Sequence, residues 1–337
     1  MRLGTEQSLE EDGWRWPSER NLCMEKLVTF FTPTYNRAHI LSRCYESLCS
    51  QHSYNFKWLI VDDGSSDNTR ELAEEWIRKE KRFPIRYIYK ENGGLHTAFN
   101  KAVEEADTEV FVCFESDDIF TEDAMTIIEK MWSEIRKTNC VGFISLCKDM
   151  KGNLIGSEYP EKVKKTLYRE HRRIAPGDKQ YVFRTSALKQ VFPMPSFPGE
   201  KFFDPKYRFF ALDRIGPLAV TNEVFDLVDY QPEGLTHTII KQYYNSPNSF
   251  AEYRKLYMQL PNRSAVYRFK QNVHYVASCL EHTALSSMAV SGRRSVGSAD
   301  TAAIGAVCCV PSGRKAPLAA PHRGHFQSSE SVFQGGL

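Results

Sequence analysis

Residues 109–118 read E-V-F-V-C-F-E-S-D-D, and this stretch decides the fold. Its first six residues are mostly aliphatic or aromatic, which predicts a short buried strand. Asp117 and Asp118 then follow the strand's carboxyl end, where open α/β sheets bind ligands. Adjacent carboxylates repel each other unless a cation lies between them, and their oxygens suit Mg²⁺ or Mn²⁺. The alternative is a solvated acidic turn.

The composition of the whole chain is that of a soluble globular protein. It has 337 residues, 42% of them apolar and 26% charged, with a net charge of +2. This balance gives no electrostatic reason to expect nucleic acid as a partner. No apolar run reaches the length of a membrane span, and the nine cysteines show no C-x-x-C pair. We therefore expect a cytoplasmic protein, with peripheral contact at the inner face of a membrane left open.

Strands and helices are expected to alternate through the first half of the chain. Strands are predicted at residues 27–31, 56–61, 85–89 and 109–114, and helices at 38–50, 68–79, 95–106 and from 121 onward. This alternation predicts an α/β fold with a doubly wound, mainly parallel sheet. A further strand is expected at residues 141–147.

Four polar loops follow the ends of these strands. They contain Tyr35, Asp63, Asn92 and the Asp117-Asp118 pair, and in a parallel sheet they meet on one edge. The chain has neither a G-x-G-x-x-G nor a G-x-x-x-x-G-K-[ST] motif, so the usual dehydrogenase and P-loop sites are not predicted. A nucleotide could still bind, with Tyr35 packing on its base and Asp63 accepting from a base N–H.

The motifs of this first half resemble glycosyltransferase family two, inverting enzymes with the GT-A fold. The resemblance lies in T-P-T-Y-N-R (32–37), V-D-D-G-S-S-D-N-T (61–69), N-G-G-L-H-T-A-F-N (92–100) and E-S-D-D (115–118). It implies a nucleotide-diphosphate sugar donor, most often a UDP-sugar, and a divalent cation. Within the family, the chain looks most like bacterial enzymes that build surface polysaccharides of the cell envelope.

The resemblance also implies roles for single residues. Tyr35 and Asp63 would hold the nucleotide base, and Pro33 would belong to the same donor site. The ribose and diphosphate would lie along Asn92, Gly93 and Asn100. Asp117 would face the donor ribose or sugar, and Asp118 would ligate Mn²⁺ or Mg²⁺, whereas Glu115 falls just before the motif.

The catalytic base is expected in the second half, within F-P-G-E-K-F at residues 197–202. There the resemblance places a carboxylate, Glu200, near the reacting sugar carbon. We expect the Pro-Gly turn to expose Glu200, while a surface carboxylate paired with Lys201 or Lys206 is its simpler interpretation. Asp204 and Asp229 are the alternatives to Glu200 as base.

Four other polar residues have both a functional and a structural interpretation. His96 could contact the diphosphate or pack at a helix start, and His237 could be a third metal ligand. Arg184 and Lys201 could bind phosphate or simply be solvated.

The expected organisation has four parts. Residues 1–25 form a flexible leader, 26–245 a GT-A domain, 246–290 C-terminal helices, and 291–337 a disordered tail. Within the domain, residues 26–150 bind the nucleotide-sugar and residues 151–245 the acceptor. The C-terminal helices interleave aromatic and basic residues, which favours packing on the domain or, as the alternative, lying on a membrane surface.

The sequence as a whole predicts a metal-dependent inverting glycosyltransferase with a glycan or lipid-linked acceptor. Two other hypotheses remain. A nucleotidyltransferase would use similar metal carboxylates but needs a basic, Gly-rich phosphate loop near the first strand. A non-catalytic nucleotide-sugar-binding protein would keep the site without turnover. The donor sugar, the linkage and the oligomeric state do not follow from the sequence.

Overall fold

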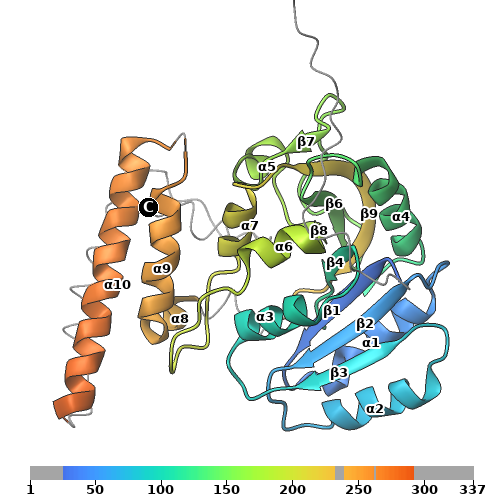
Figure 1. The fold of residues 1–337 in the computed structure, drawn as a ribbon, viewed down its shortest axis with the longest axis horizontal. Coiled ribbons are helices and arrows are strands. Elements are labelled where there is room, and N and C mark those ends of the chain that lie inside the picture. The colour runs from blue at the N-terminus through green and yellow to red at the C-terminus, as the bar shows by residue number, and fades with distance from the viewer. Residues whose placement is uncertain (1–25, 232–238, 262, 292–337) are drawn as a thin grey trace, which may run out of the picture.

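The computed structural model describes residues 26–231, 239–261 and 263–291. A mixed sheet of nine strands forms its centre, in the order β3-β2-β1-β4-β8-β6-β9-β5 with β7 paired to β9. Figure 1 shows the sheet and its helices in one body, with a helical hairpin beside it. The predicted leader and almost all of the predicted tail lie outside the described residues.

The first half of the sheet is parallel, as predicted. Its elements are β1 (Val28–Thr34), α1 (Ala38–Cys49), β2 (Phe56–Asp62), α2 (Thr69–Lys79), β3 (Ile85–Tyr89), α3 (Leu95–Glu105) and β4 (Val110–Cys113). Strand β1 pairs in parallel with β2 and β4, and β2 with β3. Because all four strands run the same way, their carboxyl ends meet at one edge.

The second half mixes strand directions, which the sequence patterns did not predict. Its elements are β5 (Ile119–Phe120), α4 (Ala124–Ile135), β6 (Gly142–Asp149), β7 (Lys165–Thr166), α5 (Tyr168–Ile174), β8 (Lys179–Arg184), α6 (Thr185–Val191), α7 (Lys206–Leu212) and β9 (Leu218–Val228). Strand β8 is antiparallel to both β4 and β6. The helix expected from residue 121 begins only at Ala124, because β5 first pairs with β9.

Two hydrophobic layers cover the sheet, because neighbouring residues of a strand point to opposite faces. Phe30 of β1 packs with helices α1, α2 and α4 on one face. Phe31 packs with α3, α6 and α7 on the other face. The alternation of these two buried rings shows that β1 is covered on both sides, as central parallel strands are.

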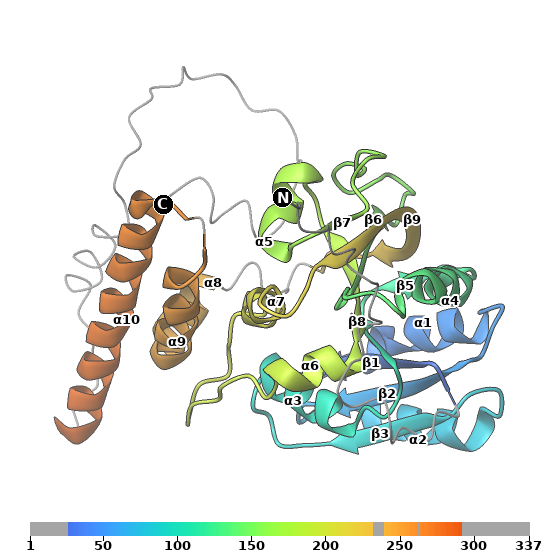
Figure 2. The same cartoon turned by 45° about the horizontal axis from the view of Figure 1, so that its top comes forward.

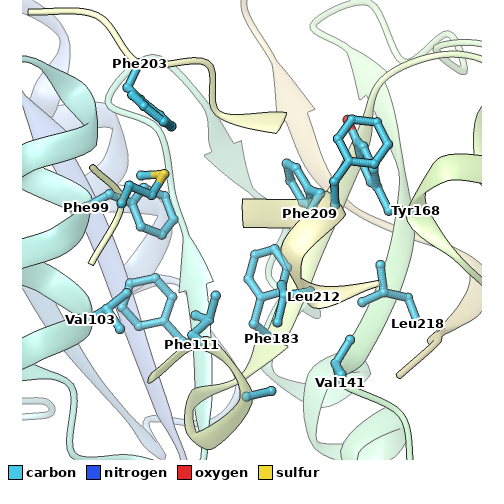
Figure 3. Packing of buried hydrophobic residues seen from close by; sticks show 14 of the residues in the cluster. Phe99, Val103, Phe111, Val141, Tyr168, Phe183, Phe203, Phe209, Leu212 and Leu218 are labelled. Carbon is cyan, nitrogen blue, oxygen red and sulfur yellow. The ribbon is translucent and has the colours of Figure 1, made fainter. Parts of the chain in front are cut away.

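An aromatic core joins the two halves (Figure 3). Phe99 of α3 lies 5.6 Å from Phe111 of β4 between ring centroids. Farther along, Phe209 of α7 lies 5.6 Å from Phe183 of β8 and stacks at 4.2 Å on Tyr168 of α5. This continuous packing holds the walls contributed by the first and second halves in a fixed relation.

The C-terminal helices form a hairpin at one end of the molecule (Figures 1 and 2). They are α8 (Ile239–Asn245), α9 (Pro247–Met258) and α10 (Ala265–Ser291). Helix α9 packs into the main core through Phe250, Tyr253 and Tyr257, in agreement with the predicted packing on the domain. Among the described helices, none combines the length and hydropathy that crossing a bilayer requires.

Candidate active site

One cavity of about 740 Å³ opens at the carboxyl ends of β1, β2 and β4. The second half closes it with the start of β8, the end of β9 and the loop before α7. Six predicted site residues line it: Pro33, Tyr35, Asp63, Asn92, Asp117 and Asp118. The loops that the sequence placed on one edge of the sheet therefore share a single cavity.

Hydrogen bonds between neighbouring loops shape the part of this cavity that the first half forms. Asn36 has a φ of 54° and accepts the Ser66 N–H at 2.8 Å, while its own N–H donates to Ser65 Oγ. This left-handed backbone is one that Asn adopts more readily than most residues. Beside it, the Tyr35 side chain is 50% exposed. Its ring is thus accessible for stacking at the mouth of the cavity.

Asp63 is buried, and it anchors the loop that leads into α3. Its Oδ1 accepts the Gly93 N–H at 3.0 Å, and its Oδ2 accepts the Gly94 N–H at 2.7 Å. Lys90 also donates to Oδ1. Since a carboxylate oxygen can accept two bonds, Oδ2 keeps capacity for one more donor from the cavity.

Acidic side chains crowd the deep end of the cavity. Glu115, Asp117, Asp118 and Asp226 all line it, and Asp226 Oδ1 accepts no hydrogen bond within the described part of the chain. Asp118 and Asp226 are buried, whereas Glu115 is exposed. Burial and then Glu115 raise the pKa of Asp226 to about 8. Carboxylates this close to one another ionise together more readily when a cation lies among them.

Asp226 is a site residue that sequence reasoning missed. It lies inside the apolar run of β9, where a single Asp looks like an exception to a strand. Its position becomes clear only through pairing, because Phe120 of β5 stands opposite Asp226 in the antiparallel register. The sequence did contain one indication of this role, namely an Asp between the apolar residues of a strand. A buried carboxylate in such a position requires a hydrogen-bonding partner or an ion.

The second half contributes a cationic wall, of which sequence reasoning named Lys201 but missed Arg208 and Lys179. Arg208 lines the cavity, and its guanidinium lies 4.3 Å from the centroid of the Phe99 ring. Burial lowers its pKa, and the charge of nearby Glu115 opposes that change. Lys179 and Lys201 line the same cavity. The site therefore has an acidic side and a basic side.

Glu200 is buried rather than exposed on its turn, so that expectation is wrong. Its residue is only 8% exposed, and its two oxygens accept the N–H groups of Asn248 and Ser249 at 2.8 and 2.7 Å. These groups belong to the first turn of α9, whose unpaired donors attract a carboxylate. Glu200 is not among the residues that line the cavity.

Asn100 and Gly93 also lie beside the cavity rather than in its lining. The Asn100 side chain donates to the carbonyl of Met194 and accepts its N–H, both at 2.8 Å. Both ends of the amide are thus occupied in joining α3 to the chain after α6.

The remaining candidates have structural surroundings or lie outside the described residues. Arg184 is 1% exposed and donates to the Arg136 carbonyl at 2.8 Å, so it is not a phosphate contact. His96 is 2% exposed, and burial lowers its pKa to about 4, which keeps it neutral. Lys201 lines the cavity. His237 lies outside the described residues.

Comparisons with known proteins agree with this architecture. The sequence profile described as Glycosyl transferase family 2 matches residues 29–192. Glycosyltransferase GlyG of Streptococcus pneumoniae is 30% identical over 115 residues, which are 34% of this chain and 36% of GlyG. Chondroitin synthase of Pasteurella multocida is 31% identical over 133 residues, 40% of this chain and 14% of that protein. The chain thus matches only a minor part of the length of these relatives.

A solved structure shows the same fold. The crystal structure of S. aureus TarS 1-349 has a TM-score of 0.52 and 15% sequence identity, covering 75% of this chain and 71% of TarS. At this identity the similarity concerns the fold alone. It confirms the α/β, GT-A-like architecture that the motifs predicted.

Proposed function

Since this chain belongs to glycosyl transferase family 2, we propose that it transfers a sugar from a nucleotide-diphosphate donor to a glycan or lipid-linked acceptor during polysaccharide assembly. The observation that carries the proposal is the single cavity in which Tyr35, Asp63 and the Asp117-Asp118 pair meet. Donor and acceptor would enter from opposite sides, the first half holding the nucleotide. The reaction would take place in the cytoplasm or at the inner face of its membrane.

The proposed donor is a UDP-sugar. Tyr35 offers an exposed ring for the base, and Asp63 Oδ2 has capacity for one base N–H. S. aureus TarS, which shares the fold, has been crystallised in complex with UDP-GlcNAc. Asn92, Gly93 and Asn100 are proposed for the ribose and diphosphate side, with Asn92 the one of the three in the cavity lining.

A divalent cation, Mn²⁺ or Mg²⁺, fits the donor chemistry of the acidic end. Asp118 is the proposed ligand, and Asp117 is proposed to face the ribose or sugar. Asp226 Oδ1, which accepts no hydrogen bond within the described residues, supports a cation at this end of the cavity. No three acidic, histidine or cysteine side chains of the described residues converge on one point. Mg²⁺ commonly takes one or two protein carboxylates together with substrate phosphates. A bound cation would offset the charge that develops on a leaving diphosphate.

The proposed chemistry is an inverting displacement that needs one base from the chain. A carboxylate would take the proton of the acceptor hydroxyl while the nucleotide diphosphate leaves from the opposite face of the sugar. Glu200 stays our candidate because of its G-E-K-F context, although its oxygens would have to leave the N–H groups of α9. Asp229, which lines the cavity and pairs with Arg43 at 2.8 Å, is its rival.

The donor proposal is tested by isothermal titration of UDP, with GDP and CDP as controls, each with and without Mn²⁺. We expect selective UDP binding that needs the metal and that Asp118→Ala abolishes. Equal binding of all three nucleotides, or none to folded protein, would contradict the assignment.

The reaction is tested separately with UDP-sugars. A glycosyltransferase releases UDP, whereas a nucleotidyltransferase forms or consumes pyrophosphate. Glu200→Gln and Asp229→Asn are then compared, and the base is the residue whose loss lowers turnover by at least about 100-fold while UDP affinity is kept. If the wild-type protein binds the donor without turnover, the non-catalytic hypothesis replaces this one.

A further inference from the structure

Over residues 265–280, helix α10 exposes several large apolar residues and buries three polar ones. Gln271, His274 and Ser278 are almost fully buried against the rest of the hairpin. The opposite side carries an apolar stripe made of Val266, Phe269, Val273, Val276 and Leu280. Val266, Phe269, Val276 and Leu280 are 64%, 68%, 53% and 64% exposed. This is the reverse of a helix that packs on a protein core.

Polar contacts fix this orientation. Arg254 of α9 is 4% exposed and donates to the Gln271 side chain at 2.6 Å. Ser278 lies 3.3 Å from the hydroxyl of Tyr243 in α8. Turning α10 to bury its apolar stripe would strip these buried groups of their partners, which is strongly unfavourable. The exposure of the stripe is therefore built into the hairpin.

The apolar stripe also faces away from the rest of the molecule. Figures 1 and 2 show α10 as the outermost helix, with α9 between it and the sheet domain. The other side of α9 is occupied by the main core, which includes Phe250 and Tyr253. A large flat partner can therefore reach the stripe without contacting the sheet domain.

The charges beside the apolar stripe select the kind of partner. Residues 265–280 contain Arg268 and Lys270 but no acidic residue. At helical spacing, Lys270 flanks the stripe on one side and Arg268 on the other. Their long side chains can extend toward an anionic surface while the stripe enters an apolar layer. Over residues 265–280, two copies of the helix would offer each other no opposite charge, and the described stripe covers only two heptads.

We propose that the apolar stripe of α10 binds the interface of an anionic membrane, with the helix lying in the membrane plane. Such a helix carries large apolar side chains on one side and basic residues around them. The inference extends the proposed function, because a lipid-linked acceptor would then be held beside the cavity. It does not require catalysis, so the two can fail separately.

The experiment measures binding of the full chain to lipid vesicles by co-sedimentation. One set of vesicles is pure phosphatidylcholine, and the other contains about 30% phosphatidylglycerol, which makes its surface clearly anionic. We expect binding to the anionic vesicles only, weakened by salt. The double change Phe269→Ser and Val276→Ser should lower the partition coefficient at least tenfold. Arg268→Gln and Lys270→Gln should each lower it about fivefold.

A matched control changes Ile77→Ser, since Ile77 is also an exposed apolar residue but lies on α2. It should bind vesicles like the wild type, and UDP titration should be unchanged in every variant. Vesicle binding that persists in the Phe269/Val276 double variant would overturn the proposal. The proposal would also be overturned if the wild-type protein did not bind vesicles but formed a dimer, and the double variant were monomeric. The apolar stripe would then bind a second copy of the chain.

Discussion

Two buried carboxylates at helix starts, Asp63 and Glu200, differ in what surrounds them. Each accepts two backbone N–H groups, Asp63 from the turn before α3 and Glu200 from the first turn of α9. Only Asp63 also lines the cavity. The comparison shows that two carboxylates with similar backbone partners can differ in their access to the cavity.

The start of α3 lies against the loop that carries Glu200. Gly94, just before α3, has a φ of 93° and lies against the backbone of Lys201, next to Glu200. Nearby, the buried ring of His96 in the first turn of α3 lies 5.9 Å from the ring of Phe203, measured between ring centroids. The region around Gly94, His96, Glu200 and Lys201 is therefore a joint between the first half and the C-terminal helices, and it can be tested one residue at a time.

The largest effect is expected from Gly94→Ala, which should push the start of α3 away from the loop that carries Glu200 and Lys201. A Cβ there would stand 1.8 Å from the Lys201 carbonyl oxygen, in a left-handed backbone that disfavours side chains. We expect the free energy of unfolding to fall by at least about 3 kcal/mol in urea denaturation. Gly199→Ala is the control, because its φ is 80° but no described atom lies within 4 Å. Gly199→Ala should therefore lose only the cost of a left-handed alanine, about 1–2 kcal/mol. A loss there as large as that of Gly94→Ala would mean that backbone strain, and not the contact with Lys201, accounts for the effect.

Replacing each carboxylate should distinguish the two roles. Both Asp63→Ala and Glu200→Ala leave buried N–H groups without acceptors, so each should lower the free energy of unfolding by about 2 kcal/mol. Asp63→Ala should in addition weaken UDP binding at least tenfold, whereas Glu200→Ala should leave it within about twofold. Calorimetry on the two folded variants measures this difference. Equal losses of UDP affinity would contradict it.

Lowering the pH should reduce the free energy of unfolding through protonation of His96. Burial lowers the pKa of His96 to about 4, so the folded protein keeps it neutral while the unfolded chain protonates it. The unfolded state thus binds more protons between about pH 6.5 and 4, and stability falls as the pH drops through this range. At pH 5 the loss from His96 amounts to about 2 kcal/mol.

The measurement is urea unfolding of His96→Leu and wild type at pH 7.5 and pH 5. The variant should lose less stability on acidification than the wild type does. His39→Gln, at an exposed position on α1, should keep the wild-type difference. An unchanged pH dependence in His96→Leu would show that other groups, such as His171 with its pKa lowered by burial to about 3, account for it.

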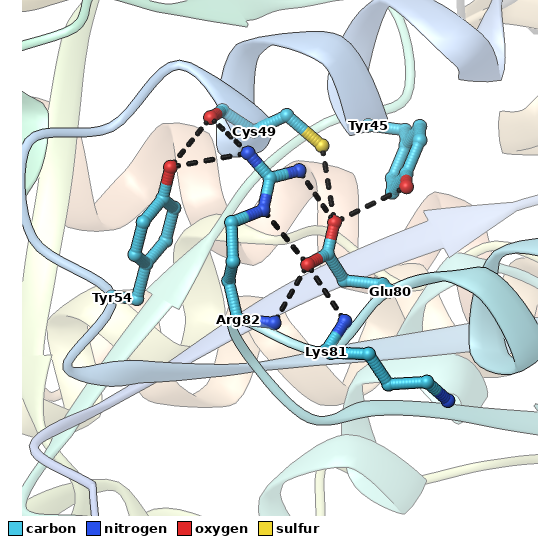
Figure 4. Close-up of polar contacts among 6 residues, drawn as sticks. All are labelled: Tyr45, Cys49, Tyr54, Glu80, Lys81 and Arg82. Carbon is cyan, nitrogen blue, oxygen red and sulfur yellow. Dashed lines mark hydrogen bonds and ion pairs between the residues drawn. The ribbon is translucent and has the colours of Figure 1, made fainter.

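The smallest effect is expected at Glu80, a third buried carboxylate that is remote from the cavity (Figure 4). Its oxygens accept the N–H groups of Lys81 and Arg82 and the Tyr45 hydroxyl, and the Arg82 side chain helps to lower its pKa to about 2. Arg82→Gln should reduce the free energy of unfolding by about 1 kcal/mol or less, because Arg82 is half-exposed and the other donors remain. UDP binding should not change. A loss of UDP affinity here would mean that such affinity reports general stability and not the site.

The first half was predictable because its signals are local. Residues 85–89 form a strand as the β-branched pattern indicates, and Asp63 follows β2 as the turn residues require. Loops at the ends of parallel strands must meet, so Tyr35, Asp63 and Asp118 could be grouped before any coordinates. Helical spacing likewise predicted the buried face of α9.

Residue pattern alone determined the α/β order, the edge of the sheet that carries the site and the acidic character of that site. Only the tertiary structure decided which polar groups meet across long stretches of chain. Glu200 finds its N–H partners 48 and 49 residues away, Asn100 finds Met194 94 residues away, and Asp226 joins the site through strand pairing. Local patterns report which apolar residues are buried, whereas the burial of a polar group such as Glu200, and its partner, depend on how distant segments pack.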